Sequence, residues 1–321
     1  MARSAPGKHW REGLSLFEIA DMFPDDATAE AWFEEIRWGA AGRPTACPKC
    51  GCTDRIKVRK SRKPGPYYCG DCRSHFSVRF GTVMQASNIP LRKWALATYL
   101  WATHLKGVSS MKLHRDLGIT QKSAWFMAHR LRKAWSEPVG DLGGPVEVDE
   151  SYFGGKRRNM SNSKRKELFG TGRGAVGKTA VVGARDQWDE TITAQVVRDT
   201  GKRTLQRFVR KHVQKGATVY TDEASAYSGL AANYDHETVN HSAKEYVNGM
   251  AHTNGIESFW SMMKRAHKGT FHHFSAKHLH RYVAEFAARH NCRNRDTLVQ
   301  MQGLAAAMIG KRLMYKELVG D

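Results

Sequence analysis

The chain has no long apolar run, few cysteines and a shortage of acidic side chains. No 18 consecutive apolar residues occur, which excludes an ordinary membrane-spanning helix, and the first residues, Met1 to Pro6, lack the apolar core of a signal peptide. We therefore expect a cytoplasmic protein. The composition gives no sign of global disorder, and 321 residues suffice for one sizeable core with one or two small appendages.

The shortage of acids leaves a large excess of positive charge. Lys and Arg number 51 against 31 Asp and Glu, which gives a formal net charge of +20 and an isoelectric point near 9.8. The excess is spread along the whole chain and is not confined to a tail. A polyanionic partner such as DNA explains this charge, whereas the alternative is a basic surface with no specific partner.

The six cysteines do not indicate a disulfide framework, because five of them fall between Cys47 and Cys72. Cys47 and Cys50 form one C-x2-C pair, Cys69 and Cys72 form another, and 18 residues separate the pairs. This is the spacing of a zinc ribbon, in which four thiolates hold one tetrahedral ion. Four thiolates leave no open coordination position, so we expect a structural Zn²⁺, with Cys52 packed as a small side chain. Zinc binding lowers the formal charge to about +18.

Between the two cysteine pairs lies a basic run, on what we expect to be the hairpin of the ribbon. A rigid small module with such a run suits contacts with DNA phosphates, although a merely solvated basic face is the alternative. The residues of the run are Arg55, Lys57, Arg59, Lys60, Arg62 and Lys63.

The segment at 88–137 predicts three helices. Residues 91–99 belong to the first, 109–117 form a short second helix, and Gly118 turns the chain into a third helix that Thr120 caps. Helix, glycine-containing turn, helix is the pattern of a helix-turn-helix module, although small helical bundles share it. Its expected solvent side, whose first two residues would face base edges, offers Gln121, Lys122, His129, Arg130, Arg132 and Lys133.

Beyond a linker rich in Pro and Gly, strand patterns precede helical ones, which predicts an α/β domain. The expected domains are a helical segment at 1–42 with two short helices around Pro24, the ribbon at 43–82, the helix-turn-helix at 88–137, the α/β domain at 145–295 and a helical tail at 296–321. The expected strands are 145–152, 178–186, 190–198, 217–222 and a weaker one near 234–240. The expected helices of this domain are 201–214, 254–268 and 275–291.

Three separated acids stand out in this domain. Asp149 and Asp222 end apolar strands, and Glu257 begins a helix. Two divalent cations about 4 Å apart need carboxylates that converge from different elements and leave room for phosphate oxygens and water. We therefore predict that the three acids meet around two Mg²⁺. The rival acids beside them are Glu147, Glu150 and Glu223.

The helix that carries Glu257 has a second interpretation. Asn254 and Glu257 fit a capping box, in which Glu257 would reach back to an amide of its own helix. Against this, Asn254, Glu257, Ser261 and Lys264 share one face, opposite an apolar stripe of Ile256, Phe259, Trp260 and Met263. A phosphate can then lie between a metal at Glu257 and the ammonium of Lys264.

These residues resemble a known family. The segments Val-Asp149-Glu-Ser-Tyr-Phe-Gly-Gly, Tyr-Thr-Asp222-Glu and Asn254-Gly-Ile-Glu257-Ser-Phe-Trp-Ser-Met-Met-Lys264-Arg265 are similar to those of DDE transposases from bacterial insertion sequences. The likeness covers most of residues 43–292. It is to the branch that carries an N-terminal zinc ribbon and is related to Merlin transposons.

The resemblance implies an RNase H-like catalytic domain, with Asp149 on the first strand, Asp222 after the fourth and Glu257 on the helix after the fifth. It implies a DNA transposase that binds terminal inverted repeats and then cuts and transfers strands with two Mg²⁺. Members of the branch differ in whether Asn or Glu takes the third position, so Asn254 rivals Glu257. Lys264 would hold the terminal phosphate, and its neighbour Arg265 would also contact DNA.

The resemblance also implies a homodimer or larger assembly on double-stranded DNA, both at the inverted repeats and at the target, and hence an association with the bacterial nucleoid. Two other functions stay open at this point. One is a metal-dependent nuclease of the same fold that cuts without strand transfer. The other is a zinc-ribbon transcription regulator without catalysis.

Two further motifs are weaker. Residues 172–179 fit G-x4-G-K-T, but a basic stretch precedes them and a strand pattern follows, so we do not expect ATP binding. The preceding basic residues better fit a loop that orders on DNA, namely Lys156, Arg157, Arg158, Lys164 and Arg165. For the histidines at 267–280, packing or phosphate contacts are favoured over a second metal site.

Overall fold

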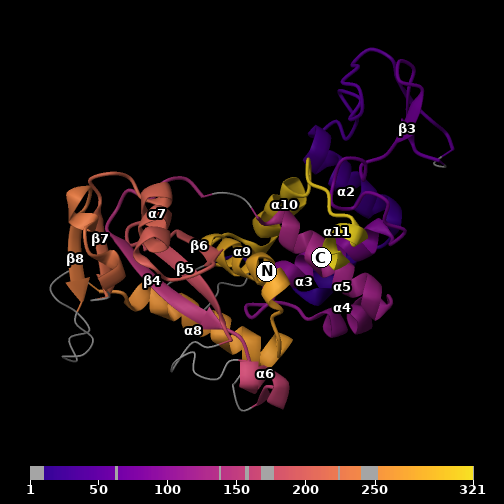
Figure 1. Ribbon diagram of the computed structural model, residues 1–321. Coiled ribbons are helices and arrows are strands. Elements are labelled where there is room, and N and C mark those ends of the chain that lie inside the picture. The colour runs from indigo at the N-terminus through magenta and orange to yellow at the C-terminus, as the bar shows by residue number, and fades with distance from the viewer. Residues whose placement is uncertain are drawn as a thin grey trace. The chain divides into compact units, whose positions relative to one another are not determined.

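The computed structural model describes residues 11–61, 64–136, 139–155, 159–167, 177–222, 225–239 and 252–320. Two compact units make up the chain (Figure 1). The first is Met1–Trp135 together with Arg293–Asp321, and the second is Ser136–Cys292. Within the described ranges, every helix is too short or too polar to span a membrane.

The first unit begins with two short helices, as the sequence predicts. Helix α1 (Leu16–Met22) has a capping box between Ser15 and Glu18, and α2 (Asp26–Trp38) is capped by Asp25, whose carboxylate accepts the Thr28 N–H. Side-chain caps of this kind satisfy amides that have no partner inside the helix.

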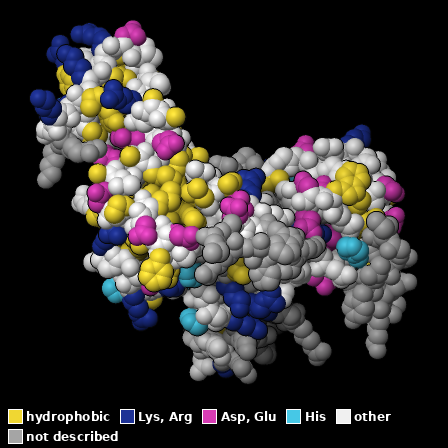
Figure 2. Space-filling model, turned by 180° about the vertical axis from the view of Figure 1, so that it is seen from behind, with side chains coloured by type: hydrophobic (Ala, Val, Ile, Leu, Met, Phe, Trp, Pro, Cys, Tyr) yellow, Lys and Arg dark blue, Asp and Glu magenta, His cyan; other side chains and the backbone are white. Residues whose placement is uncertain are grey.

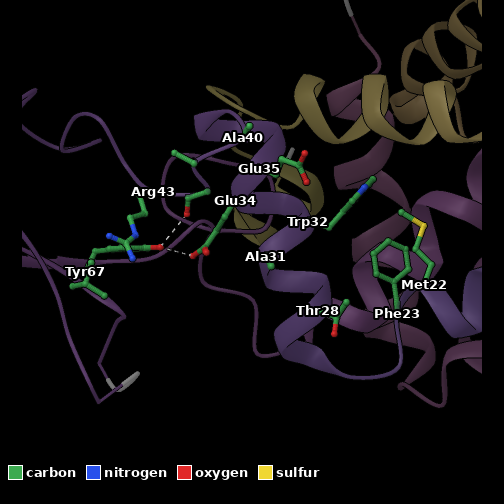
Figure 3. A pocket seen from close by; sticks show the side chains of 13 residues that line it. Met22, Phe23, Thr28, Ala31, Trp32, Glu34, Glu35, Ala40, Arg43 and Tyr67 are labelled. Carbon is green, nitrogen blue, oxygen red and sulfur yellow. Dashed lines mark hydrogen bonds between the residues drawn. The ribbon is translucent and has the colours of Figure 1, made fainter.

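A three-stranded antiparallel sheet follows, in the order β1 (Ile56–Val58), β2 (Tyr67–Cys69) and β3 (Ser74–Phe76). Its small core contains Cys47, Cys69 and Phe76, with Trp38 of α2 packed against it. The Tyr67 hydroxyl donates a 2.9 Å hydrogen bond to the buried carboxylate of Glu34, which ties α2 to the sheet (Figure 3). Helix α2 and the three-stranded sheet therefore pack against each other.

The predicted three-helix block is confirmed as α3 (Leu91–Thr103), α4 (Ser110–Leu117) and α5 (Gln121–Ala134). Gly118 ends α4 in the left-handed conformation, at φ 56°, and Thr120 caps α5 through its side chain. A glycine adopts this φ without the steric cost of a side chain. The C-terminal helices α10 (Thr297–Ala307) and α11 (Tyr315–Val319) also belong to this unit, and α10 packs against α2, α3 and α5.

The second unit is built on a five-stranded sheet, and every predicted strand is confirmed. The order is β6-β5-β4-β7-β8, where β4 pairs antiparallel with β5, β5 antiparallel with β6, and β4, β7 and β8 are parallel. The strands are β4 (Val146–Phe153), β5 (Thr179–Asp186), β6 (Ile192–Val197), β7 (Thr218–Asp222) and β8 (Asp235–Val239).

Helices cover both faces of this sheet (Figure 1). Helix α7 (Lys202–His212) packs on the face that carries Val146 and Val148, whereas α8 (Asn254–Ala266) and α9 (Leu279–Asn291) pack on the face that carries Val181. The shorter elements are α6 (Asn162–Glu167), 3-10 turns at Ser225–Tyr227, Leu230–Ala232 and Ala276–His278, and a π-helical turn at His267–Phe271.

Candidate active site

Asp149 and Asp222 lie on neighbouring parallel strands. The register pairs Val146 with Val219 and Glu147 with Tyr220, so the same offset places Asp149 of β4 beside Asp222 at the end of β7. Because the two strands run in the same direction, residues with the same offset lie side by side along them. Two acids that are far apart in sequence are thereby brought together.

Helix α8 brings Glu257 to the same face of the sheet. Its predicted stripe is confirmed, because Ile256, Phe259, Trp260 and Met263 are buried while the face of Glu257 is exposed. The strand partner of Asp149 is Gly183, and a Cβ there would lie 2.8 Å from the Trp260 ring. A glycine at this position therefore lets α8 pack close to the sheet beside Asp149.

The capping-box interpretation of Glu257 is wrong in its geometry. The N-cap of α8 is Thr253, and Asn254 is already the first helical residue. Glu257 lies one turn in, where its carboxylate accepts a 3.3 Å hydrogen bond from the Thr253 hydroxyl. Asn254 is exposed at the same end of the helix.

Glu147, a rival acid in the sequence, is fully buried and holds the start of α8. One carboxylate oxygen accepts the Ile256 N–H at 2.7 Å, and the other accepts Arg185 at 3.0 Å and Gln187 at 3.2 Å. Gly255 leaves room for this, since a Cβ there would lie 2.2 Å from the Arg185 guanidinium. Glu147 therefore acts as a positioning residue for α8. The charged Arg185 within an apolar strand was the only sequence signal for this role.

Glu150, the other described rival, lies on the opposite face of β4 from Asp149, because successive side chains of a strand alternate. Its carboxylate accepts a 2.6 Å hydrogen bond from Tyr227, which packs with the core on the α7 side. Burial and the Glu150 carboxylate raise the pKa of Tyr227 far above its usual range, so the hydroxyl stays protonated. No pattern in the sequence indicates this role for Tyr227. Glu223 lies outside the described residues.

The pKa of Asp149 reflects the nearby negative charges of the other acids. Burial raises the pKa of Asp149 from 3.8 to about 7, and the negative charges of Glu150, Asp222 and Glu257 add to this rise. Like charges close together disfavour ionisation, and a bound divalent cation reverses that effect. An oxygen-rich group of this charge fits Mg²⁺. Among the described residues, however, only the four ribbon cysteines bring all their ligand atoms within 4.8 Å of one another, so the three carboxylates are more widely spaced.

The ribbon cysteines form a second candidate metal centre. The Sγ atoms of Cys47 and Cys72 are 3.7 Å apart, and those of Cys50 and Cys69 are 3.6 Å apart. A tetrahedral ion with Zn–S bonds of about 2.3 Å needs sulfurs roughly 3.8 Å apart, so the spacing fits zinc. The Cys72 N–H lowers the pKa of Cys69 to about 6, which favours the thiolate that a metal requires.

The predicted DNA contacts of the ribbon are partly described. Arg55, Lys57 and Lys60 are exposed on and beside β1, where Figure 2 shows Lys and Arg side chains on the ribbon at the upper left. Arg55 also pairs with Asp71 at 3.3 Å, and Arg59 contacts the His75 ring at 3.4 Å. Predicted contacts outside the described residues are Arg62, Lys63, Lys156, Arg157, Arg158 and the side chain of Lys164. Arg165 is described and exposed.

On α5, part of the expected solvent side is wrong. Gln121 and Lys122 are exposed, but His129, Arg130 and Arg132 are buried. The Arg130 guanidinium donates to the Gln85 carbonyl at 3.1 Å and lies 4.1 Å over the Phe126 ring, and burial lowers its pKa to about 10. The C-terminal half of α5 is covered by other parts of its unit, which its own periodicity does not reveal.

Comparisons with known proteins agree with this arrangement of domains. A family model described as "ISXO2-like transposase domain" matches residues 141–291, and one described as "Transposase zinc-ribbon domain" matches residues 24–75. A protein of Halobacterium salinarum named "Uncharacterized protein in transposable element ISH50" is 31% identical over 254 residues, which are 76% of this chain and 83% of that protein. The chain belongs to the ISXO2-like transposase family.

The matches divide the transposase as the structure does. The transposase-domain match contains all five strands of the large sheet together with α7 and α8. The zinc-ribbon match begins at residue 24 and so includes α2, whose Glu34 binds Tyr67 of the ribbon. The Halobacterium relative is archaeal, so the likeness is not confined to bacteria. The transposase is thus a DNA-binding protein of a family that cleaves and transfers DNA.

Proposed function

We propose that Asp149, Asp222 and Glu257 are the catalytic carboxylates of a transposase that cuts DNA at the ends of its element and joins them to target DNA. The fold we infer for the second unit is RNase H-like, since three antiparallel strands are followed by two that are parallel to the first. When bound, two Mg²⁺ would activate the attacking oxygen and stabilise the leaving 3′ oxygen.

The observation that carries this proposal is the negative charge around Asp149. The pKa of Asp149 is raised to about 7 by burial and by neighbouring acids that include Asp222 on β7 and Glu257 on α8. Such an arrangement destabilises the ionised carboxylate, and strongly shifted pKa values of this kind cluster at functional sites. The buried acid Glu147 of the same strand differs, because its negative charge is paired with Arg185. The contrast favours Asp149 over Glu147 as the metal ligand of β4.

The remaining side chains have distinct tasks in this proposal. Lys264 is exposed on the same face of α8 as Glu257, two turns further along, and would hold a phosphate of the DNA end, with Arg265 beside it. Asn254 is the alternative third metal ligand, one turn before Glu257. Glu147 keeps α8 against β4 and so sets the distance between Asp149 and Glu257.

DNA recognition is assigned to the first unit. Its α4–α5 pair, joined at Gly118, is interpreted as a helix-turn-helix, with Gln121 and Lys122 directed to base edges of the inverted repeat. The exposed Lys57 and Lys60 of the ribbon would contact phosphates. Because two ends must be joined together, a dimer or larger assembly on DNA is expected by analogy with the family.

The test uses the full chain and duplexes that contain the inverted repeat flanking its gene. The wild-type protein should cleave these duplexes with Mg²⁺, whereas Asp149→Asn should bind them with unchanged affinity and not cleave. Asp235→Asn, an exposed aspartate of β8, is the matched control and should retain activity. Normal cleavage by Asp149→Asn would refute the assignment.

Two further comparisons complete the test. A pre-cleaved end with a free 3′ hydroxyl should be joined to a second duplex by the wild-type protein, which a nuclease without strand transfer would not do. Glu257→Gln and Asn254→Ala should then differ in the Mg²⁺ concentration needed for cleavage. We expect the larger increase for Glu257→Gln, because a carboxylate binds Mg²⁺ more strongly than an amide oxygen.

A further inference from the structure

A basic pocket lies beyond the acids, at the far ends of β4 and α8. Its volume is about 450 Å³, and its walls include Phe153 at the end of β4 and Lys264 on α8. The Lys and His side chains around it are Lys178, Lys264, Lys268, His267 and His272. The described lining residues include no Asp or Glu. A concave site with this charge favours an anion.

Lys178 lines the pocket from the start of β5, the strand next to β4. It precedes β5, where Thr179 pairs with Phe153, and it is the lysine of the G-x4-G-K-T segment. A strand follows it, so the helix that a nucleotide-binding loop requires does not form there. A Cβ on Gly154 would lie 3.1 Å from the Lys178 Cα, so a glycine there eases this close approach. We therefore assign Lys178 to the wall of this pocket and not to an ATP-binding loop.

The other wall is an irregular continuation of α8. Residues His267–Phe271 form a π-helical turn, and His272 then adopts a left-handed conformation at φ 59°. Single π-turns and left-handed residues other than glycine cost conformational energy and concentrate at functional sites. Here they place Lys268 and His272 around the same pocket as Lys264. Burial and the nearby cations lower the pKa of His267, which is the effect expected where positive charges gather.

The candidate active site and the pocket share the same two elements, β4 and α8. Asp149 and Phe153 lie on β4, and Glu257 and Lys264 lie on α8, where seven residues span about 10 Å. A single DNA strand can therefore extend from the acids into the pocket. A phosphate ester is the anion that such a strand presents there.

We propose that this pocket binds the backbone phosphate adjacent to the reacting phosphodiester, with Lys178 and Lys268 as its ligands besides Lys264. The inference rests on the proposed function, because it takes the acids as the point of reaction. It assigns a DNA-binding role to Lys178, Lys268 and His272. It also predicts the path of the DNA strand over the protein, which runs from Glu257 toward the C-terminal end of α8.

The test is a binding experiment with end-containing duplexes in which one phosphate at a time is replaced by an uncharged methylphosphonate. Fluorescence anisotropy gives the affinity of the wild-type protein and of Lys178→Gln/Lys268→Gln. The control is Lys211→Gln/Lys215→Gln, which removes two exposed charges at and after the end of α7. The melting temperature of each variant, followed by circular dichroism, verifies that it is folded.

For the wild-type protein and the control, we expect methylphosphonate to weaken binding at the position adjacent to the reacting phosphate. In the pocket variant the same replacement should have a smaller effect, because two of the three lysines proposed to contact this phosphate are already lost. The slope of log affinity against log salt should fall by up to about 0.9 in the pocket variant, which is the contribution of one neutralised phosphate, and stay unchanged in the control.

Two results would overturn the proposal. One is a pocket variant with the same methylphosphonate profile and salt slope as the wild-type protein. The other is tight binding of free dAMP or inorganic phosphate in the absence of DNA, abolished in the pocket variant, which would make this a small-molecule site. Failure of the wild-type protein to cleave or join DNA would instead refute the proposed function, and the binding profile would still decide the pocket.

Discussion

Replacing Glu147 by glutamine tests whether this buried acid positions α8 or takes part in metal binding. The side chain is 0% exposed and accepts hydrogen bonds from the Ile256 N–H, from Arg185 and from Gln187. Glutamine has nearly the same shape but no charge, and only one of its two terminal atoms can accept. The substitution therefore removes the ion pair with Arg185 and weakens the hold on the first turn of α8.

The size of the effect follows from these contacts. A hydrogen bond to a charged group contributes about 1.5–3 kcal/mol, and breaking a buried ion pair costs about 3–5 kcal/mol. Arg185 keeps a second partner, Glu190, at 3.0 Å, and glutamine keeps one acceptor, so the lower part of this range applies. We expect α8 to lose about 2–3 kcal/mol of local stability.

Hydrogen exchange followed by mass spectrometry measures this locally, without assuming that a chain of two units unfolds in one step. Amides of α8 should exchange roughly 30- to 150-fold faster in Glu147→Gln. Glu237→Gln, on an exposed residue of β8, is the control and should change nothing beyond the ~0.5 kcal/mol typical of surface sites. Unchanged exchange in α8 together with loss of Mg²⁺ binding would refute the positioning role and make Glu147 a metal ligand.

Three other predictions follow from the structure. In the metal-free protein, the raised pKa of Asp149 means that its contribution to stability is complete below pH 3.8 and is lost as the pH rises through about 7. Above pH 7, Asp149→Asn should therefore raise the free energy of unfolding of the second unit by at most about 4 kcal/mol, which is measured as a higher melting temperature. A difference from the wild-type protein that does not depend on pH would contradict this. Gly183→Ala should displace Trp260 and cost about 1–3 kcal/mol with loss of cleavage, whereas Gly140→Ala, with open space around it, should be neutral in the same melting and cleavage assays. Cys69→Ser should reduce bound zinc, measured by atomic absorption, and weaken binding to the DNA end while the second unit melts unchanged; full zinc occupancy would refute the four-cysteine site.

Much of the local structure was predictable from the sequence. Apolar periodicity located the five strands of the large sheet and the buried stripe of α8, because the pattern of burial repeats with the geometry of each element. The four cysteines were predictable as one cluster for a similar reason, since two short C-x2-C turns can each present a pair of thiolates to one ion. The exposed face of Glu257 and Lys264 followed from the same helical spacing.

Only the tertiary structure decided among neighbouring residues of the same type. Glu147, Asp149 and Glu150 are equivalent acids in the sequence, yet Arg185 neutralises the first and Tyr227 binds the third. These partners come from other elements of the fold, so no local pattern indicates them. Arg130 was misplaced for the same reason, since its cover comes from Gln85 and other residues outside α5.

The sequence by itself therefore determined which elements form and which side chains each presents, because those properties depend on residues within a few positions of one another. The tertiary structure decided which acids gather charge, which acid is neutralised, and that α10 and α11 join the N-terminal unit. Those outcomes depend on packing between segments that are distant in the chain, where the partner of a charged group sets whether it is structural or available for chemistry.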